Sequence, residues 1–264
     1  MEKYPQMKVV AVDRDQEAIN WARSSDSPFF QALQSGRMFL FKSNFKDFFS
    51  RYEEKIQALT QGQGFDLMLL DLGVSSPQLD QAARGFSFYQ DGPLDMRMDQ
   101  DQQFTAADLI NHFDEEELIE VFQEFGEIRR PHRVVKALLE QRGVKPFLRT
   151  GELAALIEKT EGWRAKGRNP STRYFLALRL KVNQELEGLG SCLEEMTEFL
   201  AEGGRLMVIS FHSLEDRIVK TSFKQSPKGF LVNKKVIQAP WSEQKQNPRA
   251  RSAKLRVFQK GEKR

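Results

Sequence analysis

The chain has 264 residues, of which 40% are hydrophobic and 29% charged, and its formal net charge is +3. This length suffices for one substantial core and a smaller inserted subdomain, and the composition is that of an ordinary globular protein. The apolar runs are shorter than the roughly 20 residues of a membrane helix, and the start lacks a signal-peptide pattern. A single cysteine, Cys192, excludes an internal disulfide, and three widely spaced histidines argue against a His/Cys metal site. We therefore expect a cytoplasmic protein that binds no metal and no membrane.

The charged residues are unevenly distributed along the chain. From Arg217 to Arg264 there are 14 Lys and Arg against two acids, a net charge of +12, so the residues before Arg217 carry −9. A basic segment beside an acidic body is typical of a protein that contacts nucleic-acid phosphates. On charge alone a solvated, disordered tail is the better interpretation. The apolar stretches 230–232 and 255–258 favour an ordered surface instead.

Apolar runs that alternate with helical patterns predict an α/β fold with a mostly parallel sheet and right-handed crossovers. The first strand is expected at residues 8–12, ending at Asp13, and Asp15 is expected to cap the helix that follows. The run 65–72 (FDLMLLDL) is almost entirely apolar, which predicts a strand covered on both faces. The pair Gly203-Gly204 is expected to end a helix before a strand. Further strands are expected at 38–41, 205–211 and 255–258.

Between residues 105 and 167 only helical patterns occur. Asp114 and Thr150 are expected to cap two of the three helices there. Helices without intervening strands inside an α/β chain predict an inserted helical subdomain, so we divide the chain into a core, residues 1–103 and 168–264, and an insertion, residues 104–167. Beyond the insertion, Cys192 lies on the apolar stripe of a helix and is interpreted as a core residue.

Two aspartates follow predicted strands. A carboxylate after a strand of a nucleotide-binding fold accepts hydrogen bonds from a ribose diol, which suits Asp13, although a plain helix cap is the alternative. Asp71 ends the strand at 65–72, at the edge where open α/β sheets bind ligands. Its alternative is a turn residue that satisfies nearby backbone amides. The residues alone leave both alternatives open.

Four longer blocks carry a family resemblance. The segment DLGVSSPQLDQAARGFSFYQDGPLDMRMD at 71–99 resembles the signature of the bacterial 16S rRNA cytosine-N4 methyltransferases, the MraW family. Three further blocks match in order and spacing: NPSTRYFLALRLKVNQELE at 169–187, RLMVISFHSLEDRIVK at 205–220 and NPRARSAKLRV at 247–257. The similarity covers almost the whole chain, from Lys8 to Phe258.

The resemblance implies both a fold and an activity. The fold is a Rossmann-like class I methyltransferase core with an inserted helical subdomain. The activity is S-adenosylmethionine-dependent methylation of the N4 amine of a cytidine in the decoding region of small-subunit rRNA. By position, the family's cofactor contacts fall on Asp13 (ribose), Phe45 (adenine), Asp71 and Gln78. Carboxylates and an aromatic ring are suitable partners for a diol, a base and a sulfonium cation.

The exocyclic amine of cytosine is a weak nucleophile because its lone pair is delocalised into the ring. An enzyme helps by accepting hydrogen bonds from the amine and by holding the nitrogen in line with the methyl group. Base-amine methyltransferases generally place an Asn/Asp/Ser-Pro-Pro-aromatic tetrapeptide here, and Ser76-Pro77-Gln78 is a partial match. We predict that the acceptor is Asp71 or the Ser75-Ser76 loop, with Asp71 and Ser76 as the catalytic candidates.

Five further residues are candidates for contacts with the RNA. Asp95 and Arg97 either shape the pocket of the target base or form a structural ion pair. His212 either faces that base, which must leave its stack to be methylated, or is a structural histidine. Arg249 and Arg251, in the basic segment, are predicted to bind phosphates.

Two features depart from the family pattern. Asn169 stands where the family usually has a histidine, so the role of that imidazole does not carry over. Family members also begin with a strand, a glycine-rich loop containing Gly-Gly-His-Ser and a helix, whose backbone amides cradle the cofactor. Here seven residues precede the strand at 8–12. We therefore expect residues 1–264 alone to bind S-adenosylmethionine very weakly and not to methylate rRNA. Unless strands 8–12 and 65–72 move together, we also expect each to leave an unpaired edge.

Three functions remain as alternatives from the sequence. The first is the rRNA methyltransferase, with 16S rRNA, naked or in the small subunit, as its partner. The second is a non-catalytic RNA-binding relic or truncated gene product that has lost cofactor binding. The third is a methyltransferase acting on a protein amide, which the basic segment disfavours. The nucleotide and the oligomeric state, a homodimer included, are left open.

Overall fold

The chain forms two compact units in the computed structural model, which describes residues 4, 6–162 and 169–262. One unit, called here the core unit, consists of Met1–Gly73 and Leu186–Arg264, and the other, the helical unit, of Val74–Glu185. The predicted boundary between residues 167 and 168 lies outside the described residues. The division into a core of 1–103 and 168–264 and an insertion of 104–167 therefore stays a prediction.

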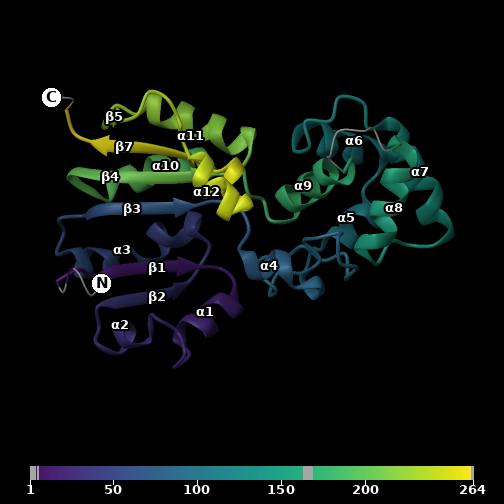
Figure 1. Ribbon diagram of the computed structural model, residues 1–264. Helices are drawn as coiled ribbons and strands as arrows, with labels where there is room; N and C mark the ends of the chain where they lie inside the picture. Colours follow the sequence, from purple (N-terminus) through teal and green to yellow (C-terminus); the bar gives the residue numbers. More distant parts are fainter. Residues whose placement is uncertain (1–3, 5, 163–168, 263–264) are drawn as a thin grey trace. The chain divides into compact units, whose positions relative to one another are not determined.

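The core unit contains two sheets (Figure 1). One pairs β1 with β2 in parallel; in the other, β3 pairs with β4 in parallel, and β7 lies antiparallel to β4 and also pairs with β5 and β6. Every strand expected from the sequence is present, and the prediction of an α/β fold with a mostly parallel sheet is confirmed for the strands β1 to β4. The strands are β1 (Val9–Asp13), β2 (Met38–Lys42), β3 (Phe65–Asp71), β4 (Leu200–Ser210), β5 (Gly229–Leu231), β6 (Ile237–Gln238) and β7 (Lys254–Lys260).

Two strand edges lack a partner within the described residues. β1 pairs only with β2, and β3 pairs only with β4. This confirms, for the part of the chain that the structure describes, the unpaired edges expected on the strands at 8–12 and 65–72. Each such edge leaves backbone N–H and C=O groups without ladder hydrogen bonds.

Two helices of the core unit, α1 and α3, begin at side-chain caps. The Asp15 carboxylate accepts a hydrogen bond from the Glu17 N–H at 3.0 Å and caps α1, as expected. Asn44 caps α3 in the same way, by accepting from the Lys46 N–H at 3.1 Å. The helices are α1 (Gln16–Arg23), α2 (Phe30–Gln34), α3 (Phe45–Thr60), α10 (Leu189–Glu198), α11 (Ser213–Gln225), α12 (Trp241–Gln246) and the 3-10 helix η2 (Pro248–Ser252).

One hydrophobic cluster, organised around α3, joins the two sheets. Phe48 of α3 contacts Phe41 of β2, with the ring centroids 5.3 Å apart. The next residue, Phe49, contacts Phe65 of β3 at 6.5 Å and Phe199 at 4.7 Å. Helices α10 and α11 complete the cluster, and Cys192 is buried in it as expected. Burial raises the pKa of the Cys192 thiol to about 12, which keeps it unreactive.

The opposite face of β3 is bare, which contradicts the sequence prediction. Met68 and Leu70 point into the cluster and are buried, whereas Leu67 and Leu69 are 54% and 57% exposed. Since successive side chains of a strand point to opposite faces, the helices α3 and α10 cover only one of them. The expectation that this strand is covered on both faces is therefore wrong for the described residues.

Gly203 and Gly204 do not separate a helix from a strand as expected. Helix α10 already ends at Glu198, and both glycines lie inside β4, next to a register shift against β3. A Cβ atom at Gly204 would lie 2.7 Å from the Phe65 carbonyl oxygen, so the close approach of the two backbones requires glycine.

The helical unit contains every helix predicted in the insertion. Asp114 caps α6, accepting from the Glu117 N–H at 2.9 Å, as predicted. Thr150, in contrast, is no cap: it is the first residue of α8, and its buried hydroxyl accepts a hydrogen bond from the Gly92 N–H at 3.0 Å. The helices are α4 (Ser76–Asp80), the 3-10 helix η1 (Ala82–Arg84), α5 (Ala106–His112), α6 (Glu115–Glu124), α7 (His132–Val144), α8 (Thr150–Glu161) and α9 (Ser171–Val182).

Among the described residues, no helix combines the length and the apolar character that spanning a bilayer requires.

The two faces of β3 predict opposite sensitivities to truncation. We expect Leu70→Ala to lower the free energy of unfolding by about 2–5 kcal/mol, because it leaves a cavity in the cluster. Leu69→Ala, the neighbour on the bare face, should cost less than about 1 kcal/mol. Urea denaturation of both variants measures this. Equal losses would contradict the one-sided packing of β3.

Candidate functional site

The carboxyl ends of β1, β2, β3 and β4 lie on the same side of the core unit (Figure 1). The residues that follow them are therefore brought to one edge of the two sheets. Ligands of open α/β sheets bind at such an edge, where strand ends leave polar groups exposed. The edge carries Asp13 after β1, Phe45 at the start of α3 after β2, Asp71 at the end of β3, and His212 after β4.

Asp13 ends β1 opposite Lys42 of β2. One of its carboxylate oxygens accepts a hydrogen bond from the Asp15 N–H at 2.8 Å. The surrounding protein atoms displace part of its hydration, and this desolvation, together with the negative charge of Asp15, raises the pKa of the Asp13 carboxyl. Asp15, and not Asp13, caps α1, so the plain-cap alternative for Asp13 does not apply.

Phe45 is half-buried at the first position of α3. Its ring packs against the hydrophobic cluster, and the Lys46 ammonium lies 5.9 Å from the ring centroid. The ring is therefore held at the strand-end edge by the cluster on one side and leaves part of its surface to solvent. This is the placement that a ring stacking beside a flat base requires.

Asp71 ends β3, opposite Ile209 of β4. Its carboxylate is exposed and accepts no hydrogen bond from the part of the chain that the structure describes. Neighbouring protein atoms displace part of its hydration, which raises the pKa of the Asp71 carboxyl, and the negative charge of Glu215 raises it further. A carboxylate without donors and with a raised pKa is the group best placed on this edge to accept hydrogen bonds from a ligand.

His212 and Glu215 form a hydrogen-bonded start to α11. The His212 Nδ1 accepts from the Glu215 N–H at 3.4 Å, and a Glu215 carboxylate oxygen accepts from the Phe211 N–H at 2.9 Å. The His212 Nε2 lies 3.0 Å from the other Glu215 oxygen, without hydrogen-bond alignment. These bonds give His212 a structural role, and its contact with the target base stays a prediction.

Glu215 is a residue that the sequence analysis missed. It is 1% exposed, and its charge acts on Asp71 across the ends of β4 and β3. The signal for it was present, because an acid three residues after a helix N-cap is a capping-box pattern. Its electrostatic effect on Asp71 could not be inferred, since it depends on the pairing of β3 with β4.

Three of the predicted residues belong to the helical unit and form the start of α4. The Ser75 hydroxyl accepts from the Gln78 N–H at 3.4 Å, and the Gln78 side-chain oxygen accepts from the Ser75 N–H at 3.0 Å, which is a capping box. Gln78 is buried by this arrangement, whereas the Ser76 side chain is exposed. Of the two serines, Ser76 is therefore the one whose hydroxyl is not used for capping.

Asp95 and Arg97 bind one another. The Arg97 guanidinium donates to both Asp95 oxygens, at 2.9 and 2.7 Å, and also to the carbonyl oxygens of Gln100 and Gln102. The hydrogen bonds to Asp95 raise the pKa of the Arg97 guanidinium. The ion-pair alternative is thus present in the structure, and it fixes the loop that follows η1. A role in the pocket of the target base stays a prediction.

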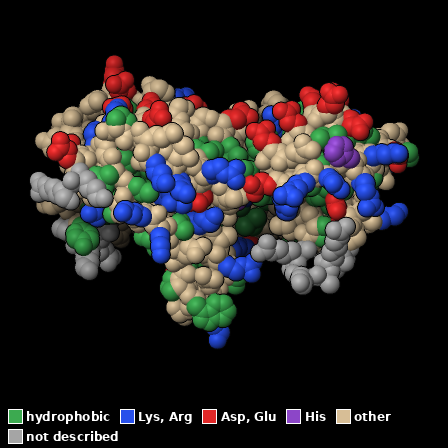
Figure 2. Space-filling view, turned by 90° about the horizontal axis from the view of Figure 1, so that it is seen from above, with side chains coloured by type: hydrophobic (Ala, Val, Ile, Leu, Met, Phe, Trp, Pro, Cys, Tyr) green, Lys and Arg blue, Asp and Glu red, His purple; other side chains and the backbone are tan. Residues whose placement is uncertain are grey.

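The basic segment is ordered over Asn233–Ser252, called here the basic loop. Arg249 and Arg251 are exposed on η2, and the loop has five Lys and Arg against one acid, Glu243. In Figure 2, which views the molecule from the side of α11, Lys and Arg side chains gather on this face of the core unit. The alternative of a disordered tail is therefore wrong for this segment.

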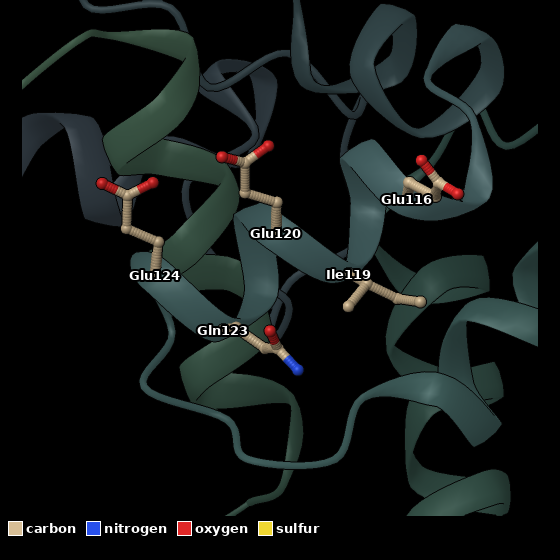
Figure 3. A pocket seen from close by; sticks show the side chains of 5 residues that line it. All are labelled: Glu116, Ile119, Glu120, Gln123 and Glu124. Carbon is tan, nitrogen blue, oxygen red and sulfur yellow. The ribbon is translucent and has the colours of Figure 1, made fainter.

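The hollow that the structure shows on α6 is not part of the candidate site. Figure 3 shows its five side chains, all from that helix, and three of them are carboxylates, those of Glu116, Glu120 and Glu124. None of the predicted site residues lines it. Among the described residues, no group of three His, Cys, Asp or Glu is arranged to hold a metal ion.

Comparison with known proteins agrees with the family resemblance carried by the sequence motifs. A model of the MraW methylase family matches residues 1–261. The Ribosomal RNA small subunit methyltransferase H of Bdellovibrio bacteriovorus is 51% identical over 258 residues, 97% of this chain and 75% of that protein. The proteins of the same name from Cyanothece sp. and Coprothermobacter proteolyticus are 44% and 42% identical, over 98% of this chain and 82% and 83% of their own lengths. The chain belongs to the MraW methylase family.

Membership of the MraW family confirms the resemblance carried by the four sequence blocks. Two of those blocks begin at strand-end positions of the core unit or run through them: 71–99 starts at Asp71, and 205–220 runs from β4 through His212 and Glu215. These two sequence motifs of the MraW family therefore include residues at the edge where a ligand of this fold is expected to bind.

The raised pKa of Asp71 predicts how stability depends on pH. Because the folded pKa lies above the unfolded one, the folded protein binds more protons between the two values, and stability falls as pH rises through that window. Asp71→Asn removes this penalty, so it should raise the melting temperature at pH 7 and lose its advantage as the pH falls towards about 4. Melting curves from pH 4 to 8 measure the effect.

The matched control is Asp66→Asn, an exposed aspartate on the same strand. Because Asp66 is exposed, we expect Asp66→Asn not to raise the melting temperature at pH 7. A melting temperature of Asp71→Asn at or below that of the wild type at pH 7 would contradict the desolvation of this carboxyl.

Proposed function

We propose that the protein is an S-adenosylmethionine-dependent methyltransferase that methylates the N4 amine of a cytidine in the decoding region of 16S rRNA. The observation that carries the proposal is the pair of carboxylates, Asp13 and Asp71, that lie partly desolvated at the strand ends of a protein of the MraW methylase family. The relatives are named as methyltransferases of small-subunit ribosomal RNA, which favours this function over a non-catalytic relic and over a protein substrate. With an rRNA substrate, naked or in the small subunit, the proposed location of the activity is the cytoplasm.

The residues at the strand-end edge fit such a cofactor. S-adenosylmethionine, when bound, supplies an electrophilic methyl group on a sulfonium cation. Asp13 offers a carboxylate oxygen to a ribose diol, and the half-buried ring of Phe45 offers an apolar surface to adenine. Asp71 offers a second carboxylate to the positive charges of the methionine part. Gln78 is proposed as a further contact, from the helical unit.

Asp71 and Ser76 are proposed to act on the target amine. Accepting a hydrogen bond from the amine returns electron density to its nitrogen, which makes the nitrogen more nucleophilic. The amine also loses a proton as the new bond to carbon forms, and a carboxylate with a raised pKa is a stronger proton acceptor than an ordinary one. The exposed hydroxyl of Ser76 is the second candidate acceptor.

The RNA is proposed to be held by the exposed cations of the basic loop, with Arg249 and Arg251 on phosphates. Asp95, Arg97 and His212 are proposed to lie near the target base. In this proposal the Asp95–Arg97 ion pair fixes the loop that contains it. His212 fixes the start of α11. Whether the protein acts as a homodimer is left to measurement of its mass in solution.

Replacing Asp71 tests the catalytic proposal. In a form of the protein that methylates rRNA, we expect Asp71→Ala to abolish methyl transfer and to leave RNA affinity nearly unchanged. The loss corresponds to a few kcal/mol of transition-state stabilisation, roughly a hundredfold or more in rate. Transfer of labelled methyl to rRNA and filter binding of the same RNA measure the two quantities. Activity within about threefold of the wild type would exclude the role.

Replacing Arg249 and Arg251 with Ala tests the RNA interface. The double variant removes up to two phosphate contacts, so the slope of log affinity against log salt should fall by about 1 to 2 units. S-adenosylmethionine affinity should not change. An unchanged slope in RNA titrations at several salt concentrations would count against these arginines as phosphate ligands.

A further inference from the structure

The basic loop presents an exposed tryptophan. Trp241, the first residue of α12, is 77% exposed. Single exposed aromatic residues are common on protein surfaces, so exposure alone carries no conclusion. Two further features set Trp241 apart: the rigidity of its support and the charge around it.

The segment that precedes Trp241 is anchored to β7. The Asn233 side chain donates to the Leu255 carbonyl at 3.2 Å and accepts from the Val257 N–H at 2.8 Å. The short strand β6 then pairs with β7, and the buried Ala250 holds the far end of the loop. Next to Trp241, the Gln244 side chain donates to the Ala239 carbonyl at 2.7 Å. The indole is therefore carried on a fixed scaffold and not on a mobile tail.

The charge around it is positive and largely uncompensated. Lys234, Lys235, Lys245 and Arg251 are exposed, and their side chains form no ion pair with any residue that the structure describes. Lys245 lies four positions after Trp241 on α12, so the two side chains share one face of the helix. An exposed aromatic ring beside cations is the arrangement by which proteins hold single-stranded nucleic acids: a base stacks on the ring and a phosphate meets the cation.

We propose that Trp241 is a stacking platform for an unpaired nucleobase of the RNA, with Lys245 on a phosphate of the same strand. The inference rests on the proposed function, since it takes RNA as the substrate. Stacking has no dependence on base identity, because every base has a π face. The site therefore recognises an unpaired nucleotide and not a sequence. A duplex, whose bases are already stacked, offers it no free face.

The first experiment measures the affinity of the 264-residue chain for a 12-nucleotide single-stranded RNA and for a duplex of the same sequence. Trp241→Ala should weaken binding of the single strand about 5- to 100-fold and of the duplex less than twofold. Trp241→Phe should restore most of the affinity. Trp241→Ala should leave the salt slope unchanged, whereas Lys245→Ala should lower it by about 0.7.

The matched control is Trp21→Ala. Trp21 of α1 is also exposed, at 56%, and packs edge-on against Phe29. Its loss should not change RNA affinity. A second measurement avoids substitution of Trp241: in a Trp21→Phe, Trp163→Phe background, Trp241 is the remaining tryptophan. Its fluorescence should be quenched by the single strand and not by the duplex.

Each contrary outcome has a distinct meaning. Unchanged affinity of Trp241→Ala together with unquenched fluorescence overturns the stacking site and leaves the proposed function standing. Equal losses for single strand and duplex overturn it in favour of a merely structural role. A loss seen only with assembled ribosomal subunits, and not with the free single strand, also overturns it. Absence of RNA binding by the wild type overturns both this inference and the RNA interface of the proposed function.

Discussion

The packing of α3 against both sheets is the interaction on which the rest of the core unit depends. In the described residues no strand joins β1 to β3, so backbone hydrogen bonds do not fix one sheet relative to the other. Consecutive residues of α3 do so instead: Phe48 contacts Phe41 of β2, and Phe49 contacts Phe65 of β3. Aromatic pairs of this kind contribute about 0.5–1.5 kcal/mol each beyond the area they bury. Side-chain packing thus holds the two sheets together where a backbone ladder is missing.

That packing has a chemical consequence at the ends of the strands. Because the two sheets keep a common direction, Asp13 and Asp71 come to the same edge, where each loses part of its hydration. The raised pKa values mean that both carboxylates oppose folding at neutral pH. Glu215 adds to the cost at Asp71, and it is held there by the hydrogen bonds that start α11. Carboxylates that destabilise the fold are expected where a cationic or hydrogen-bonding ligand is to be bound.

Local patterns predicted the fold well, and contacts between distant segments account for what they missed. The strand before Asp13 and the caps Asp15 and Asp114 follow from residues within one turn, and the structure confirms them. The exposure of Leu67 and Leu69 depends on which helices cover the sheet, which an apolar run does not encode. The placement of Gly203-Gly204 depends on the approach of β3. Among the site residues, Asp71 was found from its position at the end of a strand. Glu215 was missed because its effect on Asp71 depends on the pairing of β3 with β4. Trp241 was missed because its support depends on the pairing of β6 with β7.

The order of the basic loop connects recognition of the RNA to the chemistry proposed for it. Ordering a disordered tail on binding would cost about 1–2 kcal/mol of free energy per residue, because the tail loses conformational entropy. The loop anchored by Asn233 and β6 has already been ordered by folding. Its cations alone would bind single and double strands alike. An aromatic ring adds preference for unpaired bases. The amine of cytosine can be methylated only when it is out of its pair and its stack. A surface that selects unpaired nucleotides and a reaction that requires one therefore favour the same conformation of the RNA.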